Sequence, residues 1–71
     1  MLEITIDMGY VCVDNKDTGE GVMLRLSHIE GIVGDNMATR FCMASSEYFD
    51  VSMPFTTVKA AMTKYEKGDL N

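Results

Sequence analysis

The nitrogen and sulfur ligands that this sequence could offer a metal ion are a single histidine, His28, and two cysteines, Cys12 and Cys42. His28 and Glu30 form a His-x-Glu pair, which is typical of zinc deaminases when a Pro-Cys-x-x-Cys motif accompanies it. The sequence has no such motif, and the two cysteines are too far apart for a Cys-x-x-Cys pair. We therefore expect no metal site and no cofactor, and we interpret both cysteines as small buried hydrophobic residues.

The residues that could catalyse a reaction are also poorly placed for it. Ser27 and His28 are neighbours, so in an extended chain their side chains point to opposite faces and cannot form a catalytic triad. In the segment 14–21, Lys16 occupies the third position, where a calcium-binding loop needs an oxygen ligand. A single copy of so short a chain can hardly enclose a catalytic pocket, which occupies roughly 300 to 1,000 Å³. We expect that the protein is not an enzyme.

Two arginines, Arg25 and Arg40, lie within segments that are otherwise apolar. A guanidinium there is costly unless its charged end reaches water, a carboxylate or a ligand. One interpretation is that the arginines pair with acidic side chains, the candidates being Glu30, Glu47 and Asp50. The other is that they donate forked hydrogen bonds to a carboxylate or phosphate at a subunit interface, with aromatic neighbours as anchors. On the second interpretation the binding residues are Arg25, Arg40, Phe41 and Tyr48.

These side chains must be positioned by strands, which the hydrophobic pattern predicts over most of the chain. Apolar residues alternate from Leu2 to Met8, as in a half-buried strand. Gly9 then interrupts the pattern, and residues 10–13 either continue this strand past a bulge or pair with it. The turn-forming residues 14–21 predict a surface loop that closes a hairpin. Further strands are predicted at 22–26, 32–33, 38–44 and 48–53, with a bend within 27–31.

The periodicity changes after Pro54, where apolar residues recur at helical spacing and form one stripe. The residues of this stripe are Phe55, Val58, Met62 and Tyr65. A threonine side chain, of Thr56 or Thr57, is expected to cap the helix, and Gly68 is expected to end it.

Together these segments predict an α+β fold, an antiparallel β-meander of four to five strands with one C-terminal amphipathic helix packed on one face. The chain 1–71 is expected to be a single domain with its sheet at 2–53, its helix at 54–67 and a short tail at 68–71.

One helix covers only one face of such a sheet, yet several strands offer apolar residues to both faces. The segments with this pattern are 10–13, 22–26 and 41–43, whereas a strand with one wet face should alternate. Something must cover the second face, and the candidates are a second copy of the chain, a different protein or a ligand. For so short a chain, a second copy is the expected cover. The expected oligomer interface consists of Tyr10, Val11, Val13, Met23 and Met43.

The charge of the chain restricts its partners. Its net charge is −5, and three basic and nine acidic residues give residues 1–53 a net charge of −6. Because such a chain repels a polyanion, direct nucleic-acid binding is not expected. Charged residues interrupt every apolar run, so neither a membrane span nor a secretory signal is predicted, and the expected location is the cytoplasm.

In size, acidity and lack of catalytic motifs, the chain resembles the accessory proteins of bacteriophages and mobile elements, which commonly inhibit a host enzyme or defence complex. The leading hypothesis is therefore a small, non-enzymatic, oligomerising protein that occupies the surface of a protein partner in the host cytoplasm. One alternative is a homo-oligomer that sequesters a small anionic ligand such as a nucleotide. A second alternative is a purely structural oligomer.

Overall fold

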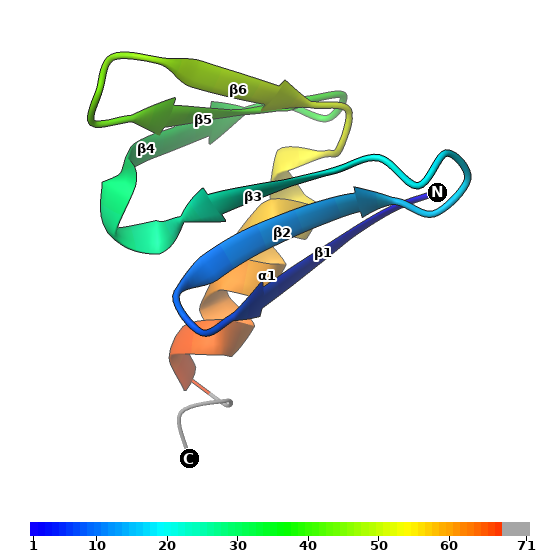
Figure 1. Ribbon diagram of the computed structural model, residues 1–71, viewed down its shortest axis with the longest axis horizontal. Helices are drawn as coiled ribbons and strands as arrows, with labels where there is room; N and C mark the ends of the chain where they lie inside the picture. Colours follow the sequence, from blue (N-terminus) through cyan, green and yellow to red (C-terminus); the bar gives the residue numbers. More distant parts are fainter. Residues whose placement is uncertain (68–71) are drawn as a thin grey trace.

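The computed structural model of the protein describes residues 1–67 and has an α+β fold (Figure 1). Within these residues, six strands form two three-stranded antiparallel sheets, and one helix follows them. The first sheet contains β1 (Leu2–Asp7), β2 (Tyr10–Asn15) and β3 (Gly21–Arg25). The second contains β4 (Ile29–Gly34), β5 (Thr39–Met43) and β6 (Tyr48–Val51). The helix α1 is Phe55–Lys67; the predicted tail at 68–71, with the helix stop at Gly68, lies outside the described residues.

The α+β class and the C-terminal helix are confirmed, but the predicted single meander of four to five strands is corrected to two sheets. The chain leaves the first sheet through a short 3₁₀ helix, η1 (Leu26–His28), which lies between β3 and β4. Directly after it, the pairing register shifts between Ile29 and Gly31, so Glu30 is an extra residue in a β-bulge. The bend predicted within 27–31 is the place where the strands divide into two sheets.

A two-residue turn at Met8 and Gly9 connects β1 to β2. Their φ angles are 51° and 85°, and two positive values in succession are what a type I′ hairpin turn requires. The two strands pair in a register that places Ile4 opposite Val13. Residues 10–13 therefore pair with the first strand rather than continue it, which decides between the two predicted alternatives.

The predicted loop between β2 and β3 is confirmed, and hydrogen bonds to Asn15 hold it. The side-chain oxygen of Asn15 accepts the backbone N–H groups of Asp17 at 2.9 Å and Thr18 at 3.3 Å. The backbone N–H of Gly19, whose φ is 80°, donates to the carbonyl of Asn15 at 2.8 Å. Glycine adopts this conformation without the steric cost that a side chain would add. The loop can therefore close, and Glu20 lies directly before β3.

Asp35 joins the turn between β4 and β5 to the start of α1. Its carboxylate accepts the backbone N–H groups of Met37 at 2.8 Å and Ala38 at 3.0 Å. Its backbone carbonyl accepts the N–H of Phe55, the first helical residue, at 2.8 Å. The backbone of another element therefore satisfies this helical N–H group, and the threonines expected to cap the helix lie inside its first turn.

Both sheets turn one face towards a shared core, which α1 completes. Figure 1 shows the helix lying behind the strands and passing down from the end of β6. Inward-facing residues alternate along the strands, and the buried apolar residues of the core are Val11, Val13, Leu24, Phe41, Met53 and Val58. The sheets and the helix therefore cover one another, and the outer face of each sheet remains exposed.

One polar side chain, Thr39, is buried in this core. Its hydroxyl donates a hydrogen bond to the backbone carbonyl of Met53 at 2.8 Å. A buried hydroxyl without such a partner would cost free energy, so this bond fastens β5 to the segment that leads into α1.

Candidate functional site

Arg25 and Tyr10 form a pair on the outer face of the first sheet. They lie directly opposite each other on β3 and β2. A guanidinium nitrogen of Arg25 donates to the phenol oxygen of Tyr10 at 2.6 Å, and the guanidinium carbon lies 5.1 Å from the ring centroid. The arginine is therefore held against the strand surface by its aromatic neighbour.

Arg40 has two partners on the outer face of the second sheet. Its Nε and Nη2 donate to the two carboxylate oxygens of Asp50, at 2.8 and 3.1 Å, in the forked geometry that guanidinium and carboxylate share. The guanidinium carbon also lies 4.0 Å from the ring centroid of Tyr48. These hydrogen bonds raise the pKa of Arg40 and lower the pKa of Asp50, because each favours the charged form of its partner.

The two arginines differ in how their charge is compensated. Arg40 has the partner that the first interpretation of the sequence names, Asp50. Among the described residues, no carboxylate lies within ion-pair distance of Arg25. Arg25 therefore carries an uncompensated positive charge on the outer face of the first sheet.

Of the other residues predicted to bind a ligand or to form an oligomer interface, some lie in the core and others lie on the surface. Phe41, Val11 and Val13 point to the core side of their strands and are buried there, so none of them is available on an outer face of the sheets. Met43 is partly buried against the same core. Tyr10 lies on the outer face of the first sheet, where Met23 is 62% exposed, and Tyr48 on the second sheet is 58% exposed.

The two cysteines are free and lie on the outer faces rather than in the core. Cys12 is directly opposite Met23 on β3, and Cys42 is directly opposite Tyr48 on β6. Both are partly buried, so the prediction of buried hydrophobic residues overstated their burial. Each outer face thus presents an arginine, a tyrosine and a cysteine.

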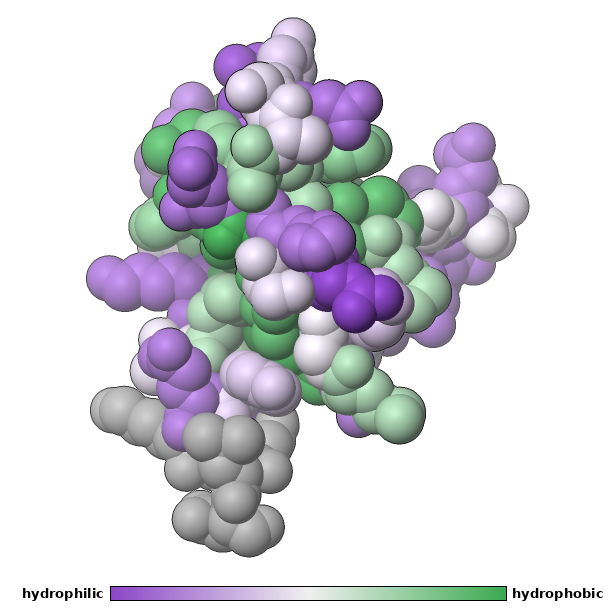
Figure 2. Space-filling view, turned by 60° about the vertical axis from the view of Figure 1, so that its left-hand side comes forward, coloured by the Kyte–Doolittle hydropathy of each residue, from purple (hydrophilic) through white to green (hydrophobic). Residues whose placement is uncertain are grey.

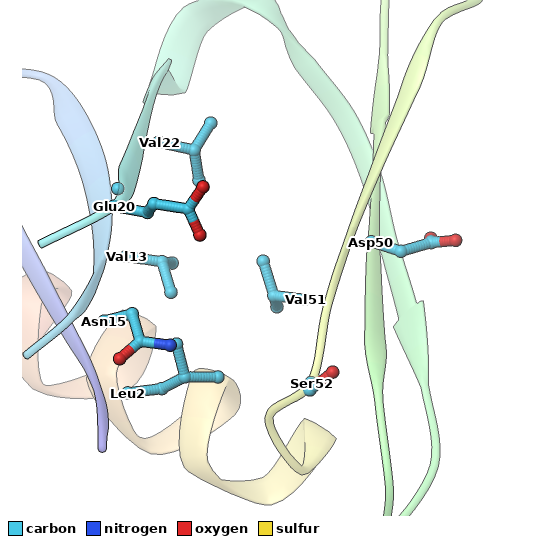
Figure 3. Close-up of a pocket in the computed structure, with 9 residues that line it drawn as sticks. Leu2, Val13, Asn15, Glu20, Val22, Asp50, Val51 and Ser52 are labelled. Carbon is cyan, nitrogen blue, oxygen red and sulfur yellow. The ribbon is translucent and has the colours of Figure 1, made fainter. Parts of the chain in front are cut away.

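A groove between the two sheets, which the sequence did not reveal, lies between the start of β3 and the end of β6 and has a volume of about 390 Å³. Figure 3 shows side chains from the first sheet facing Val51 of β6 across it. The apolar residues that line this inter-sheet groove are Leu2, Val13, Val22 and Val51. Its polar lining includes Asn15, Glu20, Asp50 and Ser52. Figure 3 also shows the carboxylate of Glu20 directed over the groove, whereas the carboxylate of Asp50 points away from it.

Apolar surface is exposed at several other places. Figure 2 shows hydrophobic atoms gathered at the surface between polar side chains on one face of the molecule. At the turns, Met8 is 88% and Met37 is 78% exposed. A second hollow lies beside η1, the end of β5 and the start of β6, and its lining includes His28, Met43 and Phe49. The molecule therefore exposes large apolar side chains on sheet faces, at turns and beside β6.

Three further features of residues 1–67 concern metal ligands, buried polar groups and membrane helices. No group of three or more His, Cys, Asp or Glu side chains there is arranged to hold a metal ion. Every buried side-chain nitrogen or oxygen in this range has a hydrogen-bond partner, and no helix in it has the length and apolar character to cross a membrane. Comparison with protein-family models, curated proteins and solved structures finds no match for the chain.

Proposed function

We propose that this chain is a small, non-enzymatic, oligomerising protein that acts in the cytoplasm by occupying the surface of a protein partner, as phage-type inhibitors of host enzymes or defence complexes do. The observation that carries the proposal is the exposure of apolar and aromatic residues beside the arginines. Met23, Val33 and Tyr48 are 62%, 56% and 58% exposed on the outer faces of the sheets. Aromatic residues, methionine and arginine are the types enriched in protein interfaces.

The acidic charge of residues 1–53 supports a partner whose surface is basic. Opposite charges speed the encounter of two proteins and favour one orientation of docking. Because paired strands hold the outer-face residues in place, binding orders few side chains and loses little entropy. A basic surface covered in this way can no longer bind its usual ligand, such as a nucleic acid.

The test is capture of a partner from a lysate of the organism that encodes the protein, at low and high salt. We expect a partner that is released as salt rises, because screening weakens attraction between exposed charges. Met23→Lys should reduce the captured amount, and Met37→Lys, at an exposed turn, is the matched control. Recovery of no partner, or only of salt-insensitive contacts, contradicts the proposal.

A homo-oligomer that sequesters a small anionic ligand is the second candidate function. The uncompensated charge of Arg25 supports it, because a guanidinium without a carboxylate partner retains donors for a phosphate or carboxylate. Native mass spectrometry of protein purified from its own host should then show a defined mass increment, which Arg25→Gln removes and Lys59→Gln retains. If the protein is a purely structural oligomer, native mass spectrometry should show an assembly without added ligand mass, and the lysate should yield no foreign partner.

A further inference from the structure

We infer that the inter-sheet groove binds an extended segment of the protein partner, one in which an aliphatic residue is flanked by lysine or arginine. The inference rests on the proposed function and names the part of the partner that is recognised. It concerns a surface between the sheets, distinct from the outer faces that carry Arg25 and Arg40.

The apolar lining of the groove supplies the site for the aliphatic side chain. Val13 and Val22 face Val51 across the opening, and Leu2 lies at its lower end in Figure 3. Leu2, Val22 and Val51 are only partly buried, although they point to the core side of their strands. An aliphatic side chain inserted here would cover surface that the fold leaves in contact with water.

Glu20 supplies the preference for a basic residue. Its carboxylate is directed over the groove in Figure 3 and has no ion-pair partner among the described residues. Asp50, the other acidic residue of the lining, is compensated by Arg40. A lysine or arginine next to the inserted aliphatic residue would therefore meet one free negative charge at the edge of an apolar surface.

The strands beside the groove favour an extended ligand. β3 is the last strand of the first sheet and β6 is the last strand of the second, so each has one edge without a strand partner. An extended segment can hydrogen-bond to the backbone of such an edge while alternate side chains enter a pocket. The aliphatic residue then enters the groove, and the long side chain of a neighbouring lysine or arginine can turn back to the carboxylate of Glu20 at the rim.

A second copy of this chain does not provide such a segment in its described residues. Among the basic residues of its strands and loops, Lys16 lies near Glu3, Arg40 is paired with Asp50, and Arg25 is held against Tyr10. The described lysine side chains that remain lie on α1, which is not extended. The charge of the groove therefore favours a foreign protein.

The experiment titrates the whole protein with a short blocked peptide of alternating lysine and valine, and follows methyl groups by NMR. We expect the signals of Val22 and Val51 to shift, while that of Val33 on an outer face does not. Glu20→Gln should weaken binding about threefold to fivefold, the effect of losing one exposed ion pair. Glu30→Gln removes the same charge at the bulge of β4 and should leave the affinity unchanged. A peptide of alternating glutamate and valine should not bind.

Absence of binding overturns the inference, as do shifts confined to the outer faces. Equal weakening by both glutamine variants also overturns it, because attraction would then be general to the acidic surface. The proposed function fails separately, when no salt-sensitive partner is captured from the lysate. A captured partner that contacts only the outer faces would preserve the proposed function and exclude the groove.

Discussion

Two carboxylates of this protein, Asp35 and Asp50, are stabilised in their charged form by hydrogen bonds. Asp35 accepts the backbone N–H groups of Met37 and Ala38, and Asp50 accepts the guanidinium of Arg40. The pKa of each carboxyl group is lowered as a result. A carboxyl group with a lower pKa in the folded chain contributes stability above its unfolded pKa and loses that contribution as the pH falls through its folded pKa.

We therefore expect the urea midpoint to fall as acid is added below about pH 5, the region where unfolded aspartates begin to bind protons. Asp35→Asn keeps the side-chain oxygen as an acceptor but removes the titrating group, so its midpoint should fall less steeply with pH. Asp7→Asn is the matched control, because Asp7 is exposed on β1 and its carboxylate accepts no hydrogen bond from the described residues. An Asp35→Asn variant with the wild-type slope would contradict the role given to this carboxylate.

Met8 occupies a left-handed backbone conformation that suits asparagine or glycine better than methionine. Its φ is 51° and its side chain is 88% exposed, so no packing compensates the conformational cost. We expect Met8→Asn to raise the free energy of unfolding by about 0.5 to 1 kcal/mol, measured by urea denaturation. The same exchange at Met37, which has no positive φ, should not stabilise the protein. Equal effects at both turns would show that the gain has another cause.

At the scale of single residues, the sequence showed that both arginines lie within apolar strands, but it did not reveal the inter-sheet groove. Asp50 was one of three candidate partners, and only the register that places it opposite Arg40 distinguishes it. Val22 and Val51 alternate in phase with the core residues of their strands. Nothing in the sequence around them shows that their side chains face each other across a groove. The sequence identifies Glu20 only as a loop residue, because the opposite side of the groove is formed by Val51 of β6, which is distant in the sequence.

At the scale of elements, Thr39 connects β5 to the segment before α1 through its bond to the carbonyl of Met53. Thr39→Val keeps the shape of the side chain but removes the donor. We expect a loss of about 1 to 2 kcal/mol in the free energy of unfolding, because the buried carbonyl is left unsatisfied. Thr5→Val, the same exchange on the exposed face of β1, should change it by less than about 0.5 kcal/mol. Similar losses at both positions would assign the effect to the strand rather than to the bond.

The elements themselves were largely predictable, whereas their division into sheets was not. Alternation identified β1, and helical spacing identified α1 to within one residue of its start. The alternation of apolar and polar residues along a strand shows which residues face inwards, but it does not show which strands pair. The division depends on η1 and on the bulge at Glu30, and both break the periodicity without a distinctive sequence signal.

At the scale of the whole molecule, the division into two sheets changes what an oligomer could bury. Each sheet already covers the inner face of the other, so the inner faces are not free for a second copy, and the outer face around Met23 is the exposed apolar surface proposed for association. Light scattering at micromolar concentration should give a multiple of the chain mass of 7.9 kDa if the proposed association occurs. Met23→Lys should shift the mass towards 7.9 kDa without loss of stability, and Met37→Lys should not. A wild-type monomer would remove the oligomer from the proposal.

The position of α1 after all six strands also has a consequence for synthesis. Both sheets are translated before the helix, yet Val58 of the helix belongs to the core that they share. The backbone carbonyl of Asp35 likewise accepts a hydrogen bond from the N–H of Phe55, which is synthesised later. Until these residues leave the ribosome, the strands can pair but cannot complete the core that they share with the helix. The nascent chain should therefore be a substrate for chaperones and proteases until α1 docks.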